Sequence, residues 1–344
     1  MNSVFQEVEI HFPKPKNFDE KNPQFDIFKN VAPNRCSKAE IKIFERVRIA
    51  TNSVIFNYFK IVPESCVNHQ NYQQYSKGFK FFLKFICPKI NFSKKTFLVI
   101  TDEWTSNYYH WHFFALKKLL ALQEVEELKN AVLFLPKKYQ KYPFVLPSLE
   151  RFGITKNRIV FLPRKSNIKV AKAATAVISQ QHVYAFQKMR EILTKNCVNS
   201  EKKFGERIYI SRQQQVLRSV ENEEAVTKLL EKFGFKKIIA EQLSYQEQVQ
   251  LFSQARYLVS PHGAGLSNIL FMQDGSKVLE MACKPFKYKP VTDYYKLAFM
   301  MNVDYFYQEC EMAASSQVMD FHHANLVVDV KKLEENLKLM LRHE

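Results

Sequence analysis

The chain has 344 residues, a formal net charge of +17 and 46% hydrophobic residues. That length can supply two domains, and the composition is that of an ordinary globular protein. No apolar run reaches about eighteen residues, which argues against a transmembrane helix. Residues 1–14 lack a basic start followed by an apolar run, so we expect no signal peptide and a cytoplasmic location. Six scattered cysteines without a C-x-x-C pair predict reduced, structural thiols.

The positive charge admits three kinds of partner: nucleic acid, an anionic membrane surface, or anionic substrates such as sugar nucleotides and acidic glycans. Nucleic acid is the least favoured, because the sequence has neither zinc-finger spacing nor an aromatic RNA-binding motif, and its lysines are spread along the chain.

The first half of the chain predicts short strands followed by alternating elements. Residues 1–60 indicate short strands and loops, with strand pairs in 47–61. A basic amphipathic helix at 77–86 is interpreted as a surface helix on a core, with membrane docking as the alternative. Strands are then expected at 96–101, 131–135 and 158–162, and helices at 108–122, 142–152 and 182–194. The alternation predicts a parallel sheet with helices on both faces.

A polar stretch at 196–205 marks the expected domain boundary, and a second alternating set follows it. Its strands are expected at 207–211, 237–239, 256–260 and 277–280, and its helices at 222–233 and after the capping box that begins at Ser244. We predict an N-terminal Rossmann-like domain over 1–200 with extra N-terminal strands, a C-terminal Rossmann-like domain over 201–320, and a helix in 321–344 that packs back. Two such doubly wound domains facing a cleft define a GT-B-like α/β architecture.

One stretch carries the strongest functional signal. An apolar strand ends at Ser260 and runs into a glycine turn that opens a short helix. Free backbone N–H groups and the positive end of a helix suit a phosphate, and glycine lets the backbone approach it closely. The turn consists of His262, Gly263, Ala264, Gly265 and Leu266.

A tight turn without a ligand is the alternative to that phosphate site. A Rossmann G-x-G-x-x-G is absent because position 268 is Asn, and no two glycines stand four apart as an esterase nucleophile elbow requires.

Polar residues after the strand at 207–211 extend the predicted site. Arg212 and Arg218 suit a diphosphate because the planar guanidinium donates two hydrogen bonds at once, and Asn222 and Glu223 follow on the same loop. A solvated surface loop is the alternative. His262 is a donor to phosphate or ribose or else a core histidine, and Glu280 accepts from ribose hydroxyls or else forms a structural ion pair.

Candidate bases follow the first strand of the alternating N-terminal set. Inverting glycosyl transfer needs one base for the acceptor hydroxyl and positive charge at the leaving diphosphate. Asp102, Glu103, His110 and His112 are the base candidates, and of the two histidines we expect only one to point into the cleft, because residues two apart cannot share a helical face. We expect no metal, since H-x-H lacks the zinc spacing and no D-x-D is present.

Taken together, these residues resemble glycosyltransferase family 61 over roughly 45–285. The resemblance is strongest at Ile208–Arg212, Arg218, Asn222-Glu223, His262–Asn268 and Val278–Glu280, with weaker support from Asn107–Trp111 and Pro63–Ser65. It implies an inverting, metal-independent GT-B enzyme with a nucleotide-activated sugar as donor. It also implies the bacterial type, which acts in capsular or other surface polysaccharide synthesis at the cytoplasmic membrane face.

We therefore expect transfer of a sugar from a nucleotide-diphosphate donor, a UDP-sugar first, to a glycan or lipid-linked saccharide, with no cofactor. The expected partners include peripheral contact with an anionic membrane and exclude nucleic acid. A non-catalytic protein that binds sugar nucleotides or glycans is the alternative, and it would tolerate loss of every base candidate.

Overall fold

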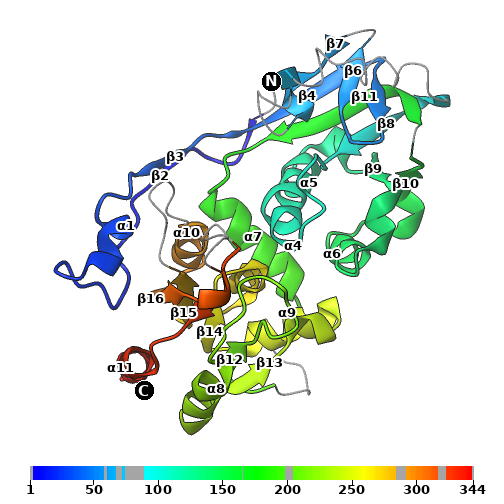
Figure 1. The fold of residues 1–344 in the computed structure, drawn as a ribbon. Helices are drawn as coiled ribbons and strands as arrows, with labels where there is room; N and C mark the ends of the chain where they lie inside the picture. The colour runs from blue at the N-terminus through cyan, green and yellow to red at the C-terminus, as the bar shows by residue number, and fades with distance from the viewer. Residues whose placement is uncertain are drawn as a thin grey trace. The chain divides into compact units, whose positions relative to one another are not determined.

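The structure is a computed structural model that describes residues 3–57, 60–66, 72–73, 89–164, 166–197, 204–283, 292–316 and 323–342. The chain divides into two compact units (Figure 1). The first consists of Met1–Val8 with Arg35–Leu193, and the second of Glu9–Asn34 with Thr194–Glu344. The basic helix expected at 77–86 lies outside the described residues. None of the described helices is long and apolar enough to cross a bilayer.

The first unit is built on a sheet whose described residues form nine strands. Four of them are parallel and lie in the order β10-β9-β8-β11. Numbered along the chain this order is 3-2-1-4, as in the first strands of a Rossmann sheet. Their bounds are β8 (Lys89–Val99), β9 (Val132–Pro136), β10 (Ile159–Leu162) and β11 (Asn167–Val177).

Shorter N-terminal strands extend this sheet beyond β11. β4 and β5 both pair antiparallel with β11, and β1, β6 and β7 continue from them. The strand pairs expected in 47–61 are confirmed as β5, β6 and β7. The bounds are β1 (Ser3–Val4), β4 (Ala39–Glu45), β5 (Arg48–Ala50), β6 (Ile55–Asn57) and β7 (Lys60–Ile61).

The helices of the first unit follow its parallel strands. After β8 one continuous helix runs through α4 (Tyr108–His110), a π-helical segment η3 (Trp111–Leu116) and α5 (Lys117–Gln123). The 3-10 helix η5 (Lys137–Lys141) and α6 (Val145–Arg151) follow β9, and α7 (Val183–Thr194) follows β11. A core of buried aliphatic and aromatic residues lies on the sheet, among them Phe97, Phe134 and Ile168.

The second unit contains a sheet in the order β13-β12-β14-β15-β16-β17, in which the first five strands are parallel and β17 is antiparallel. Numbered along the chain the parallel strands read 2-1-3-4-5, which is the flavodoxin-like doubly wound order. The bounds are β12 (Arg207–Ile210), β13 (Lys236–Ile238), β14 (Tyr257–Pro261), β15 (Lys277–Cys283), β16 (Asp304–Met312) and β17 (Leu326–Val327).

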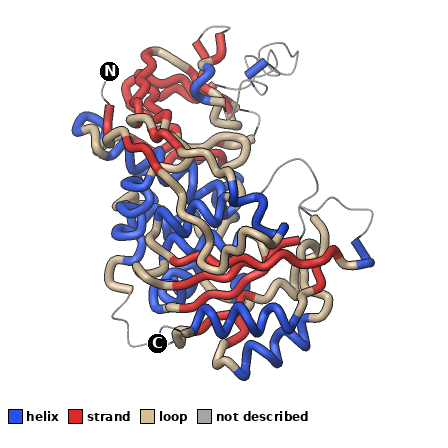
Figure 2. Tube along the Cα trace, turned by 90° about the vertical axis from the view of Figure 1, so that its left-hand side faces the viewer, coloured by secondary structure: helices blue, strands red, loops and turns tan. Residues whose placement is uncertain are grey.

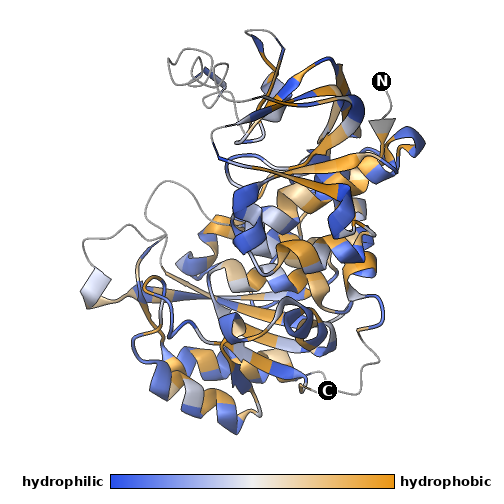
Figure 3. Cartoon of the chain, turned by 90° about the vertical axis from the view of Figure 1, so that its right-hand side faces the viewer, coloured by the Kyte–Doolittle hydropathy of each residue, from blue (hydrophilic) through white to orange (hydrophobic). Residues whose placement is uncertain are grey.

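Helices cover this second sheet along its length (Figure 2). The apolar sides of α8 (Glu223–Lys232) and α11 (Val330–Leu341) pack on buried residues of β12, β14, β15 and β16. Figure 3 shows the hydrophilic residues of these amphipathic helices alternating with hydrophobic ones, while the strands are largely hydrophobic. α9 (Tyr245–Gln254) and α10 (Asp293–Met300) contact the 3-10 helix η8 (Ala264–Phe271).

Two local signals in this unit are confirmed in detail. Ser244 and Glu247 form the expected capping box at the start of α9. Gly234 has φ +76°, and the N–H of Phe235 bonds to the carbonyl of Leu230, so Gly234 ends α8 as a C-cap glycine should.

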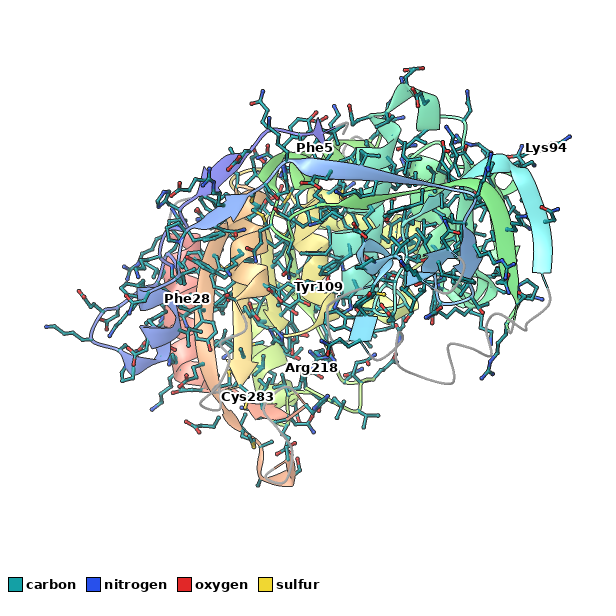
Figure 4. All side chains as sticks on the ribbon, turned by 90° about the horizontal axis from the view of Figure 1, so that it is seen from above. Phe5, Phe28, Lys94, Tyr109, Arg218 and Cys283 are labelled. Atoms are coloured by element: carbon teal, nitrogen blue, oxygen red, sulfur yellow. The ribbon has the colours of Figure 1, made fainter. Side chains whose placement is uncertain are left out.

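Residues 9–34 group with the second unit, although they precede most of the first unit in sequence. They run beside β16. The N–H of Lys16 donates to Tyr305 O at 2.8 Å, and Asn17 exchanges hydrogen bonds with the backbone of Tyr307. Phe28 packs against Tyr305 and Tyr307. Figure 4 labels Phe28 on this N-terminal segment. This segment covers strand backbone that would otherwise lie on an open sheet edge.

Candidate functional site

The glycine turn lies where a doubly wound sheet binds its ligands. In the second unit β12 and β14 are neighbours, and the chain connections leave them in opposite directions. Ligands of such sheets bind at this switch point, outside the carboxyl ends of the strands. Arg212 follows the end of β12, and His262 with Gly263 follows the end of β14. The structure therefore brings together at one edge two motifs that are 50 residues apart in sequence.

Both glycines of the turn are required by neighbours from β12. A β-carbon on Gly263 would lie 3.0 Å from Arg212 Cζ, and one on Gly265 would lie 3.3 Å from Ile210 Cδ1. These distances are tighter than ordinary packing, so a β-carbon at 263 would move the end of the Arg212 side chain and one at 265 would crowd Ile210. Within the described part of the chain, no hydrogen bond engages the N–H groups of Ala264 and Gly265 at the start of η8. These two donors are available to an anion.

Two arginines supply positive charge beside this turn. Arg212 is largely buried, and its Nη2 donates to Leu217 O at 3.1 Å. Burial and the nearby charge of Arg218 lower the pKa of Arg212 to about 10, so it stays protonated at neutral pH. Arg218 is held in the left-handed region at φ +61°. Among the described residues, neither Nε has a hydrogen-bond acceptor, although both atoms are buried.

Such an arrangement is costly without a ligand. Two like charges disfavour each other, and buried donors without acceptors lose their hydration. An anion placed between the guanidinium groups and the turn would relieve both penalties and would accept charge-assisted hydrogen bonds.

His262 belongs to a buried chain of hydrogen bonds at the same edge. Its Nδ1 bonds to Glu280 Oε1, and Tyr305 Oη donates to Glu280 Oε2 at 2.7 Å. Because a carboxylate only accepts, Nδ1 carries the proton and the ring is fixed with Nε2 pointing away from Glu280. The ring of Tyr294 lies 5.2 Å from that of His262.

The surroundings of Glu280 bear on its expected contact with ribose. Only 1% of the residue is exposed, and each of its carboxylate oxygens already accepts a hydrogen bond from the protein. This geometry suits a residue that orients His262 better than one that binds a ribose directly.

Asn222 and Glu223 are used inside the second unit. The side-chain amide of Asn222 exchanges two hydrogen bonds with the backbone of Val328. Glu223 accepts from Tyr209 Oη at 2.9 Å and pairs with Lys237 at 3.0 Å. Both residues thereby attach the start of α8 to neighbouring elements.

The base candidates lie in the first unit, after the carboxyl end of β8. Asp102 is 5% exposed, and its Oδ1 accepts from the N–H groups of Trp104 and Thr105. Its Oδ2 lies 3.3 Å from Lys118 Nζ. Asp102 therefore stabilises the turn at 102–105 with Oδ1 and pairs with Lys118 of α5 through Oδ2. Glu103 is half-buried on the same turn.

The two histidines of the helix after β8 have different environments. His112 is fully buried, and its Nδ1 donates to Tyr108 O at 2.8 Å. Burial lowers the pKa of His112 to about 4, so it is neutral at physiological pH. His110 is half-buried, with its ring 5.6 Å from that of Trp104. It directly precedes the π-helical segment, a distortion that often occurs at functional sites.

Sequence reasoning missed two aromatic members of the His262 cluster. Tyr294 and Tyr305 lie in α10 and β16, elements for which no strand or helix was expected. Burial and the charge of Glu280 raise the pKa of both phenols, which places them next to that carboxylate. The run Tyr305-Phe306-Tyr307 near the start of β16 was the available signal.

The fold and site define a protein of two α/β units, one of which carries a glycine turn and two arginines suited to a phosphate. The family model Glycosyltransferase 61 matches residues 61–279. The chain therefore belongs to glycosyltransferase family 61, as the sequence resemblance predicts, and as a glycosyltransferase it binds a sugar donor and a glycan acceptor. Among curated proteins, a search found no sequence that matches the chain.

Proposed function

We propose that the protein is an inverting glycosyltransferase of GT-B type that takes a sugar from a nucleotide diphosphate and needs no metal ion. In this proposal the second unit binds the donor at the carboxyl ends of β12 and β14. The first unit supplies the base for the acceptor. A role in surface polysaccharide synthesis belongs to the same proposal.

The observation that carries the proposal is the packing of Arg212 on Gly263. This packing places the Arg212 guanidinium beside the turn whose N–H groups open η8. Arg218 is close enough that its positive charge lowers the pKa of Arg212. Cations and oriented backbone donors stabilise the negative charge that develops on a leaving diphosphate. These groups would take the place that a divalent ion holds in other transferases. The arrangement is fixed before the donor binds, so little reorganisation is needed.

His262 supports the same role from the other side of the turn. With Nδ1 held by Glu280, its Nε2 is free to meet a phosphate or ribose oxygen. A neutral His262 would accept from a ribose hydroxyl, and a protonated one would donate to a phosphate. We place Glu280 and Tyr305 behind His262 as positioning residues.

For the base we propose His110, with Glu103 as the next candidate. Asp102 has both oxygens engaged by its own turn and by Lys118, so a proton transfer there would weaken the turn. An imidazole has its unperturbed pKa near 6.5, which suits general base catalysis at neutral pH.

The decisive experiment compares Arg212→Ala with Arg256→Ala. Arg256 is an exposed residue that directly precedes β14, at the opposite end of that strand from the glycine turn. Binding of UDP, GDP and CMP is measured first by thermal shift, since a bound nucleotide raises the melting temperature by mass action. Arg212→Ala is expected to abolish transfer and to weaken nucleotide binding by about 100-fold, as loss of a charge-assisted contact predicts. Unchanged nucleotide binding in Arg212→Ala would overturn the donor site.

Both oxygens of Asp102 are engaged by protein groups, so this carboxylate is poorly placed to act as the base. This observation favours one alternative, a protein that binds sugar nucleotides without transferring the sugar. The two are separated by His110→Ala and Glu103→Gln. Loss of transfer with intact nucleotide binding identifies an enzyme with a base in the first unit. Nucleotide binding in a wild-type protein that never transfers or hydrolyses a donor identifies the binding protein.

A further inference from the structure

A basic pocket in the first unit is not used by the proposed donor site. It has a volume of about 560 Å³ and opens beyond the ends of β9 and β10. Its floor includes Pro136 and Leu162, the last residues of those strands, and its walls carry four cations: Lys137, Lys138, Lys141 and Arg164. We call it the 137–164 pocket. A volume of this size is typical of small-ligand sites, and the carboxyl ends of parallel strands are where such sheets bind ligands.

Three cations of this pocket, Lys137, Lys141 and Arg164, form no salt bridge with a carboxylate among the described residues. In the same unit, Lys118 and Lys129 are each paired with an acidic side chain. Positive charges that line a concave surface without counter-ions raise the local concentration of anions and attract them. The three lysines line one cavity together with Arg164.

The pocket adjoins the turn that carries the base candidates. Tyr139, which lies between two of the pocket residues, forms a 2.7 Å hydrogen bond between its Oη and Thr105 Oγ1. Thr105 in turn is hydrogen-bonded to the backbone of Asp102. Lys138 is close enough to Asp102 and Glu103 that their charges act on it. A molecule held in the pocket would therefore lie beside the residue 102–105 turn.

We propose that the 137–164 pocket binds an anionic substituent, a carboxylate or a phosphate, on the acceptor saccharide. This inference rests on the proposed glycosyltransferase function and names the class of acceptor. The planar guanidinium of Arg164 would engage the anion with two hydrogen bonds, and Lys137 and Lys141 would add compact positive charges. Neutral saccharides of the same size would gain none of these contacts.

Binding is tested directly, without any sugar transfer. The probes are tetragalacturonate, its fully methyl-esterified form, mannose 6-phosphate and mannose, each titrated into the full-length protein by calorimetry at low and at physiological salt. Tetragalacturonate or mannose 6-phosphate should bind, and the uncharged partner of each should bind at least tenfold more weakly. Preference for one of the two anions identifies its chemistry. Affinity should fall as salt rises, because the charges are exposed.

A matched pair of triple variants locates the site. The pocket variant is K137Q/K141Q/R164Q, and the control is K60Q/K94Q/K95Q, which removes the same charge from exposed residues of the first unit that do not line the pocket. The pocket variant should weaken anion binding at least tenfold, while the control should change it less than threefold. Thermal unfolding checks that both variants remain folded.

Nucleotide binding distinguishes a failure of this inference from a failure of the proposed function on which it rests. If UDP binds normally but no anionic saccharide binds, the acceptor inference is wrong and the donor site stands. The same holds if both triple variants weaken the binding of the anionic saccharide equally. If UDP itself does not bind, the proposed function fails first. Equal binding of tetragalacturonate and its methyl ester would also overturn the inference.

Discussion

Arg212 lies against the α-carbon of Gly263, so closely that a β-carbon there would be 3.0 Å from the guanidinium carbon. Arg212, which we assign to the diphosphate, can thus take this position because residue 263 has no side chain. Glycine at 263 is needed twice: its φ of +159° with ψ of 178° is a conformation that other residues rarely adopt, and it leaves the space that Arg212 occupies.

Substituting this glycine should damage the donor site without unfolding the protein. In Gly263→Ala the new methyl group displaces Arg212, and UDP affinity is expected to fall by about tenfold to 100-fold. Gly275→Ala is the control, since φ there is +74° but no atom lies within 4 Å of the added methyl. That variant should lose about 1 kcal/mol of stability and keep its UDP affinity. Calorimetric titration of UDP into both variants decides, and equal affinities would refute the steric argument.

Tyr305 should affect activity by supporting His262 and not by contacting the substrate. In Tyr305→Phe the buried carboxylate of Glu280 loses one hydrogen bond, and the His262 ring loses part of its support. We expect kcat to fall several-fold and the pH–rate profile to shift, with little change in KM for the acceptor. Tyr295→Phe is the control, because its hydroxyl donates to Pro13 O outside this chain of hydrogen bonds. An unshifted pH profile in Tyr305→Phe, or an equal loss in the control, would leave Tyr305 with a purely structural role.

Acid should destabilise the first unit through His112. Its pKa is about 4 in the folded protein, whereas an unfolded histidine titrates near 6.5. The unfolded chain therefore binds more protons between these values, so stability falls as the pH drops through that window. By pH 4 the loss should be roughly 3 kcal/mol.

Urea unfolding at pH 7.5 and pH 4 measures this loss. The variant His112→Gln should show a smaller drop than the wild type, since an amide can donate to Tyr108 O without gaining charge. His11→Gln replaces an exposed histidine and should behave as the wild type. A wild-type drop no larger than that of His112→Gln would contradict the buried, neutral imidazole.

Local patterns predicted much of the fold because they report on neighbours in sequence. The Ser244 capping box, the Gly234 helix end and the strand–turn–helix at 257–271 each depend on contacts within a few residues, and each is found where it was expected. β11 was missed, because the lysines and small alanines in 167–177 give little hydrophobic signal for a central strand. Its burial comes from partners on both sides, β8 and β4.

The site was predicted less completely, for a related reason. Arg212 and the 263–266 turn could be placed at one edge of the sheet, because both closely follow strands that the sequence predicts. The surroundings of Glu280, Asn222 and Asp102 could not, because a polar side chain looks the same in sequence whether it meets a ligand or a distant backbone group. Only the fold shows that Val328 satisfies Asn222 and that Tyr305 occupies an oxygen of Glu280.

Residues 9–34 pack along β16, and this packing has a consequence for biosynthesis. These residues leave the ribosome long before the strand they cover, Asp304–Met312. The second unit therefore cannot be completed until residue 312 has been made, and until then the earlier segment has no partner. A truncated gene that starts at residue 204 would encode a sheet with a bare margin, prone to pair with copies of itself.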